Sequence, residues 1–208
     1  MKIYKFKLDI MNLSILSSLI FIPIFVILDD IIILKPVHLI YMILWFILHE
    51  IIHYIGFLFS KGVSFNDLVI GIKLENGIMY CMCKKEINKK EIMLSLLLPF
   101  FVIGLLTGII GIIADLKFLI FLSLTNIVGA VGDITMAFFL LKMPNDILYF
   151  DRDDEGGFYL KSKKDLSIYN NRYIKNDKLE ECPINNKKIR ISLISYILIA
   201  FMILICFI

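Results

Sequence analysis

Cysteine is scarce in this sequence, and its spacing excludes the common cysteine frameworks. The 208 residues include only Cys81, Cys83, Cys182 and Cys206, and no two of them are spaced as C-x-x-C. Cys81 and Cys83 would share one face of a strand, but no further cysteine or histidine lies nearby in sequence to complete a tetrahedral set. We therefore expect free thiols, and neither a disulfide framework nor a cysteine zinc site.

Charged residues are also few, and neither sign dominates. They make up 20% of the chain, and the formal net charge is only +3. Nothing in this distribution calls for a nucleic-acid partner. Hydrophobic residues reach 59% and the mean hydropathy is +0.84, whereas apolar usage in soluble domains is nearer about one half. The composition therefore predicts an integral membrane protein whose surroundings are the lipid bilayer.

Five segments are long and apolar enough to cross a bilayer, which takes roughly 17 to 25 apolar residues per helix. They lie near residues 10–28, 36–59, 92–113, 116–141 and 191–208. No A-x-A-like cleavage site precedes Asp29, so the first segment is expected to be a retained anchor. The predicted fold is an all-α polytopic membrane protein of about five transmembrane helices, with a membrane-embedded core at 1–160. A cytoplasmic polar segment and C-terminal membrane anchor follow at 161–208.

The second predicted span contains the motif His49-Glu50-Ile51-Ile52-His53. On a helix, positions i and i+4 project from one face, so His49 and His53 can bind one Zn²⁺ while Glu50 reaches a water on the metal. Ionisable groups within a membrane span are costly and indicate function by default. A chance match, or a polar helix contact without metal, is the alternative interpretation.

Asp133 is the best candidate for a third ligand. At 1.5 Å per residue, it lies at about the same depth along the 116–141 span as His49 and His53 along theirs. A His₂Asp set would leave one position open for water, as in catalytic zinc sites. The alternative is a helix-end aspartate solvated at the interface. Asn126, two turns away, would either donate to a substrate carbonyl or bond across helices, and the sequence leaves both open.

A β-hairpin is predicted at residues 68–83, because Asn76-Gly77 separates two β-prone runs. The hairpin would either lie on the membrane surface as a connector or offer an edge strand to an extended substrate. Gly71 and Tyr80 are its candidate substrate-binding residues. Farther along, the acidic cluster 151–155 lacks the spacing of a calcium loop and is expected to be a solvated turn. At most a short strand is expected around Phe158.

The lysine and arginine residues are concentrated in the predicted loops on one side of the membrane. The N-terminus, the loop between the second and third spans and the residues from 142 to 190 are basic, whereas only Lys35 and Lys117 fall on the other side. The positive-inside rule therefore predicts a multi-pass protein of the cell membrane with a cytoplasmic N-terminus. The His-Glu-x-x-His motif would then lie towards the cytoplasmic side.

The residues quoted above resemble the putative zincin peptidase family of bacterial membrane proteins. The resemblance covers roughly residues 41–160 and is carried by His49-Glu50-x-x-His53, the hairpin, Leu98-Pro99-Phe100 and Gly132-Asp133. The layout is similar, more distantly, to site-2 proteases, in which a later helix carries an Asn and then an Asp that is the third zinc ligand. Unlike that pattern, no proline follows Asn126, and Gly132 precedes Asp133.

Motif and resemblance together predict an intramembrane zinc metalloprotease. It would hydrolyse peptide bonds in membrane or membrane-proximal protein substrates, with Zn²⁺ held by His49, His53 and Asp133 and with Glu50 activating the zinc-bound water. The alternative is a non-catalytic membrane scaffold or metal-binding protein that retains the protease fold.

Overall fold

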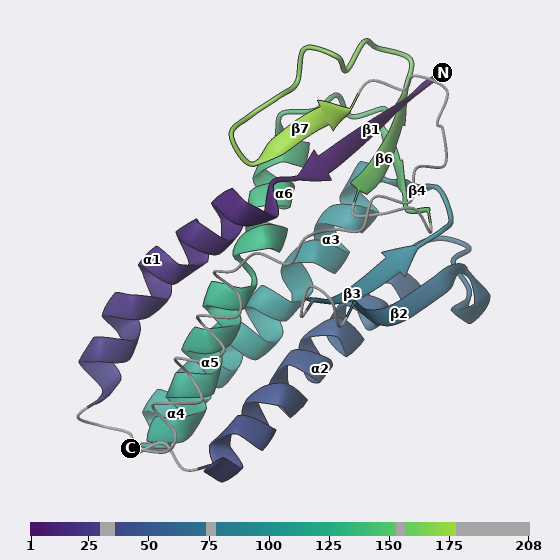
Figure 1. The fold of residues 1–208 in the computed structure, drawn as a ribbon. Helices are drawn as coiled ribbons and strands as arrows, with labels where there is room; N and C mark the ends of the chain where they lie inside the picture. The colour runs from purple at the N-terminus through teal and green to yellow at the C-terminus, as the bar shows by residue number, and fades with distance from the viewer. Residues whose placement is uncertain (30–35, 74–77, 153–156, 178–208) are drawn as a thin grey trace.

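The computed structural model describes residues 1–29, 36–73, 78–152 and 157–177. Its helices run roughly alongside one another, and a β-sheet covers one end of them (Figure 1). The helical segments are α1 (Ile10–Asp29), α2 (Pro36–Leu58), α3 (Lys89–Pro99), the π-helical η2 (Phe100–Leu106), α4 (Thr107–Ile113), α5 (Lys117–Gly129) and α6 (Val131–Leu141). The predicted fifth span, 191–208, lies outside the described residues.

The prediction of an all-α protein was wrong. Strands β4, β5, β6, β1 and β7 form, in that order, a five-stranded sheet, and β2 and β3 form a separate two-stranded sheet. The strands are β1 (Lys2–Leu8), β2 (Leu68–Lys73), β3 (Ile78–Cys83), β4 (Ile87–Asn88), β5 (Leu148–Phe150), β6 (Gly157–Ser162) and β7 (Ile174–Asp177). Every pairing in both sheets is antiparallel.

The sheet joins the two ends of the described chain. β1 pairs with β6 in the register Tyr4↔Leu160 and Phe6↔Phe158, and β7 pairs with the other edge of β1. The strand expected around Phe158 is thus present, but it runs to Ser162 and is central to the sheet. The basic N-terminus is itself a strand, because Tyr4, Phe6 and Leu8 alternate with lysines and only the apolar face meets the core.

Only some of the predicted spans are membrane-crossing helices by length and composition. Among the described residues, two stretches qualify, Ile40–Leu58 and Lys89–Ile113. The predicted span 116–141 is not one straight helix: α5 and α6 meet at Ala130 and are bent by 45°, so this pair counts as a third span only if it is taken as one. The apolar helices support membrane association.

One hydrophobic core joins the sheet to the helices below it. The Phe6 ring stacks on Phe158 with centroids 5.6 Å apart and meets Phe139 of α6 edge-on at 5.2 Å. Phe57 of α2 and Leu96 of α3 belong to the same cluster. Because burying each such side chain contributes about 1.5–3 kcal/mol, this core fixes α2, α3 and α6 relative to one another.

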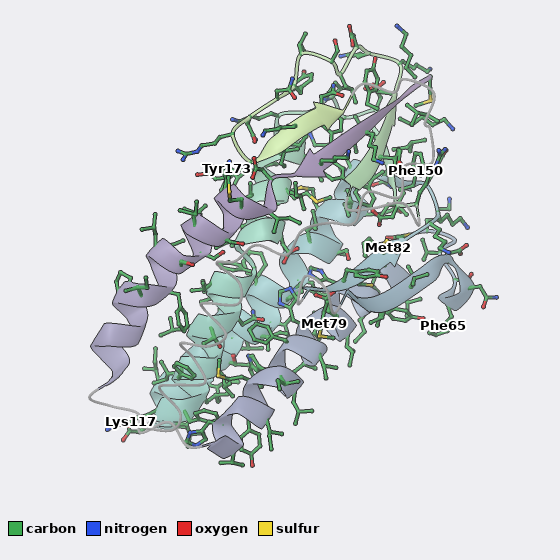
Figure 2. The ribbon with its side chains drawn as sticks, viewed as in Figure 1. Phe65, Met79, Met82, Lys117, Phe150 and Tyr173 are labelled. Atoms are coloured by element: carbon green, nitrogen blue, oxygen red, sulfur yellow. The ribbon has the colours of Figure 1, made fainter. Side chains whose placement is uncertain are left out.

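The hairpin prediction is confirmed in its two strands, which pair Leu68 with Cys83 and Gly71 with Tyr80. Its Asn-Gly turn lies outside the described residues. β3 runs against α2, and Met79 and Met82 mark that strand in Figure 2. The hairpin therefore lies beside the helix that carries both histidines.

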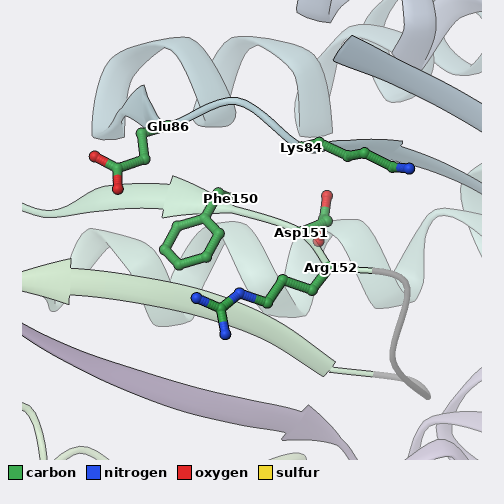
Figure 3. A pocket seen from close by; sticks show the side chains of 5 residues that line it. All are labelled: Lys84, Glu86, Phe150, Asp151 and Arg152. Atoms are coloured by element: carbon green, nitrogen blue, oxygen red, sulfur yellow. The ribbon is translucent and has the colours of Figure 1, made fainter.

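Asp151 attaches the hairpin to the five-stranded sheet. Its Oδ2 accepts from the Cys83 backbone N–H at 2.9 Å and its Oδ1 accepts from the Tyr149 hydroxyl at 2.8 Å. Burial raises the pKa of Asp151 to about 7, although both donors oppose that shift. Asp151 also lines a surface depression of about 400 Å³, together with Lys84, Glu86, Phe150 and Arg152. Figure 3 shows these five side chains.

This buried carboxyl makes folding stability depend on pH. An aspartate in the unfolded chain has a pKa near 3.8, so between about pH 4 and pH 7 the folded state keeps a proton that the unfolded state has lost. The contribution of Asp151 to stability therefore falls as pH rises through that interval and is constant above it. Asp151→Asn should remove this decline, as measured by thermal unfolding of detergent-purified protein at pH 5 and pH 8.

The control is Asp146→Asn, which changes an exposed carboxyl. It should keep the pH dependence of the wild-type protein. An Asp151→Asn protein that loses as much stability between pH 5 and pH 8 as the wild type would contradict the assignment.

Candidate metal centre

Three side chains from two helices converge on one point. Asp133 Oδ2 lies 3.1 Å from His49 Nε2 and 3.4 Å from His53 Nε2, and the two Nε2 atoms are 3.0 Å apart. These are the ligand candidates that the motif and the matching helix depths predicted. They form the one group of three or more His, Cys, Asp or Glu side chains with metal-binding spacing that the described part of the chain contains.

Two helices bring these residues together. His49 and His53 are one turn apart on α2, so their side chains leave the same face. Asp133 lies in the first turn of α6, where the N-terminal end of the helix dipole favours a negative charge. The bend at Ala130 is what starts a new helix here, and it thereby places the carboxylate at a helix N-terminus.

The hydrogen-bond partner of His49 Nδ1 determines which nitrogen of this imidazole carries the proton. His49 Nδ1 lies 2.8 Å from Asn126 Oδ1, and Asn126 Nδ2 donates to the Pro99 carbonyl at 3.2 Å. Because the amide nitrogen faces that carbonyl, the amide oxygen is the atom that faces His49 and can only accept. His49 Nδ1 is therefore the protonated nitrogen, and in the neutral ring Nε2 carries a lone pair.

His53 is held in the same tautomer by a different partner. Its Nδ1 lies 2.9 Å from the Ser95 carbonyl oxygen, which is an acceptor. Ser95 Oγ in turn donates to the His53 carbonyl at 3.0 Å. The lone pair of His53 Nε2 consequently points at His49 Nε2 and at Asp133.

Three lone-pair atoms thus meet in a buried position. One added proton could bridge only one of the three contacts, whereas a cation can satisfy all of them, so the donor set fits a metal ion. Two neutral imidazoles and a carboxylate are ligands that zinc accepts in catalytic sites, with a position left over for water or substrate. His49 and His53 are 7% and 6% exposed, whereas the Asp133 side chain is 23% exposed, so the site opens on the Asp133 side.

Glu50 follows His49 on α2 and is half-buried. The β3 strand passes beside it: burial, together with the negative charges of Glu50 and Asp151, raises the pKa of the Cys81 thiol. Burial likewise raises the pKa of Cys83 to about 11. Both thiols are therefore protonated near neutral pH.

The residues proposed to bind substrate fall into two groups. Asn126 is 1% exposed and uses both polar atoms within the protein, which is the bond across helices that the sequence left open. Gly71 and Tyr80 face each other across the hairpin, and a Cβ on Gly71 would lie 2.4 Å from the Tyr80 ring. Direct contact of any of these residues with a substrate stays a prediction.

Sequence reasoning missed Ser95 as a partner of the site. The available signal was the proline four residues later, because a proline inside a helix lacks the N–H that would bond the carbonyl at i−4. That carbonyl belongs to Ser95. The structure shows that His53 Nδ1 donates to it.

A comparison of the sequence with known protein families finds a match. A family model described as "Putative zincin peptidase" matches residues 42–148, about half of the chain. The matched segment includes the two histidines, Glu50, Pro99, Asn126 and Asp133, and it leaves out strands β1, β6 and β7. No curated protein and no solved structure matches the chain.

The convergence of the three ligands predicts what their loss would do. Asp133→Asn should reduce the zinc bound per purified chain by tenfold or more, because an amide oxygen replaces the only anionic ligand. The matched control is Asp115→Asn, which alters an exposed aspartate with a positive φ of 52° that asparagine also adopts. Elemental analysis after dialysis against limiting zinc measures the difference, and equal zinc in both variants would contradict the site.

Proposed function

The chain belongs to the putative zincin peptidase family, and from that premise we propose that it is a zinc metallopeptidase acting on membrane or membrane-proximal proteins. The observation that carries the proposal is the convergence of His49 Nε2, His53 Nε2 and Asp133 Oδ2 within 3.4 Å of one another. The family match supports the peptidase class. The position of both histidines on an apolar helix long enough to cross a bilayer supports a substrate at the membrane.

His49, His53 and Asp133 would hold the zinc ion. When bound, zinc supplies Lewis acidity, which polarises a peptide carbonyl and makes water more acidic. Glu50 is the base: its carboxylate accepts the proton of the attacking water and then donates it to the leaving amine. The Nδ1–H bonds of the two histidines keep their Nε2 atoms aimed at one point throughout, so the ligands need not reorganise during the reaction.

A peptide would reach the site past the start of α6. Asp133 is the most exposed of the three ligands, and a Cβ built on Gly132, the residue before it, meets no atom within 4 Å. The backbone of a substrate can therefore come close to this turn. The substrate must be extended there, because a helical peptide keeps its amides bonded internally.

The hairpin provides a means of holding an extended peptide. Strands β2 and β3 form a sheet of their own, separate from the five-stranded sheet, and β3 lies against α2 near Glu50. A substrate segment that adds to this small sheet would gain backbone hydrogen bonds along its length. From the distribution of lysine and arginine, we propose that the chain is a multi-pass protein of the cell membrane, with this side in the cytoplasm.

Removing the base should separate catalysis from metal binding. Glu50→Gln keeps the size of the side chain but cannot accept a proton, and loss of general acid–base catalysis costs about 10²–10⁴-fold in rate. We expect cells carrying Glu50→Gln to accumulate uncut one or more membrane proteins that wild-type cells cleave, as measured by mass spectrometry of protein termini in the membrane fraction.

The control is Glu86→Gln, which changes an exposed glutamate that pairs with Lys161 on the five-stranded sheet. Its pattern of termini should equal that of the wild type, and both variants should bind zinc normally. If Glu50→Gln and the wild type yield the same termini, the peptidase proposal fails.

The open space beside Gly132 gives a second test. Glycine in a helix costs about 0.8–1.0 kcal/mol relative to alanine, and nothing in the chain crowds this position. Gly132→Ala should therefore raise thermal stability slightly and leave zinc binding unchanged. If a substrate backbone passes here, the added methyl group should raise KM for a substrate identified with Glu50→Gln by tenfold or more, and an unchanged KM would argue for another entry.

A further inference from the structure

We propose that one turn of α3, Ser95–Pro99, is the element that positions both metal-binding histidines, acting on His53 directly and on His49 through Asn126. Ser95, Pro99 and Asn126 are not themselves ligands. The inference deepens the proposed function, and rests on it for the identity of the ion. The inference predicts which nitrogen of each imidazole carries the proton, and this tautomer can be measured without an ion.

The first half of the arrangement depends on a missing donor. An ordinary residue at position 99 would donate its N–H to the carbonyl of Ser95, four residues earlier, but proline has no N–H. The Ser95 carbonyl lies in the middle of α3 and is buried, so it needs another donor. His53 Nδ1 is that donor, at 2.9 Å.

The second half uses the carbonyl of the same proline. Pro99 is followed directly by the π-helical segment η2, and its carbonyl accepts from Asn126 Nδ2 at 3.2 Å. This bond orients the amide so that its oxygen faces His49 Nδ1 at 2.8 Å. The two imidazoles are thus fixed from the same point of α3, one through a single bond and the other through an intervening amide.

Close packing keeps this turn in place against α2. A Cβ added to Gly56 would lie only 2.8 Å from Ser95 Cα, which shows that the two helices touch through backbone at this point. Ser95 Oγ also donates to the His53 carbonyl at 3.0 Å. At the start of α3, Glu91 accepts from the backbone N–H groups of both Asn88 and Lys61, and so joins the turn that follows α2 to the beginning of α3.

The arrangement has a measurable consequence for each histidine. Partners of the second imidazole nitrogen typically contribute 10–100-fold in metal affinity, because they fix the tautomer and the orientation of the ring. Asn126 should affect His49 and leave His53 unchanged, whereas Pro99 should affect His53. A merely structural role in packing would not divide the effects in this way.

The first experiment uses Asn126→Leu, which keeps the volume but removes both polar atoms. Purified full-length protein labelled with ¹⁵N-histidine is examined by NMR without zinc, and zinc affinity is measured by competition with a chelator. We expect His49 to lose its Nδ1–H form, His53 to keep it, and zinc to bind 10–100-fold more weakly. The control Thr125→Val deletes a buried hydroxyl that donates to the Leu122 carbonyl, and should leave both measurements unchanged.

The second experiment uses Pro99→Ala, which restores an N–H that competes with His53 for the Ser95 carbonyl. We expect the Nδ1–H form of His53 to weaken while that of His49 is retained, with zinc affinity again reduced. Pro23→Ala is the matched control, since Pro23 also lies inside a helix but is exposed on α1. If Asn126→Leu does not fold, the comparison of Pro99→Ala with Pro23→Ala decides.

The outcomes separate this inference from the proposed function. Unchanged histidine tautomers in both Asn126→Leu and Pro99→Ala would overturn the positioning role, even in a protein that cleaves peptides. The expected tautomer shifts, found in a protein whose Glu50→Gln variant leaves all membrane proteins processed as before, would support the positioning role while the peptidase proposal falls. A wild-type protein with Nε2–H histidines would overturn the inference directly.

Discussion

The convergence of two imidazole nitrogens and a carboxylate oxygen at one buried point is the constraint on which the site depends. Two imidazole nitrogens and a carboxylate oxygen lie within 3.4 Å of one another, and their outward nitrogens are already committed to oxygen acceptors. Such an arrangement is costly unless a cation occupies it. The backbone contact of α2 with α3, the bend before α6 and the shared core below the sheet all serve to hold these three atoms together.

Much of the site could be predicted from the sequence because helical geometry is regular. The four-residue interval between His49 and His53 places both on one face, and a rise of 1.5 Å per residue was enough to match Asp133 to their depth. The hairpin followed from Asn76-Gly77 between two apolar runs. These inferences needed only local periodicity and the cost of placing polar groups among apolar ones.

The sheet could not be predicted in the same way, because its strands pair across the whole chain. Lys2–Leu8 carries three lysines and was taken for a basic loop, although Tyr4, Phe6 and Leu8 alternate with them. Its partners Gly157–Ser162 and Ile174–Asp177 lie at the opposite end of the described chain. The choice between the two roles of Asn126 could not be made for a related reason: it depends on which atoms of the neighbouring helices are free, and no periodicity reports that.

The five-stranded sheet combines strands from distant parts of the chain, and this limits how the chain can cross a bilayer. β1, β4 and β5 belong to one sheet, and a hydrogen-bonded sheet cannot be divided between two faces of a membrane. The number of crossings between β1 and β4 must therefore be even, and so must the number between β4 and β5. Helices α1 and α2 thus cross together or not at all, and the same parity governs the segment from α3 to α6.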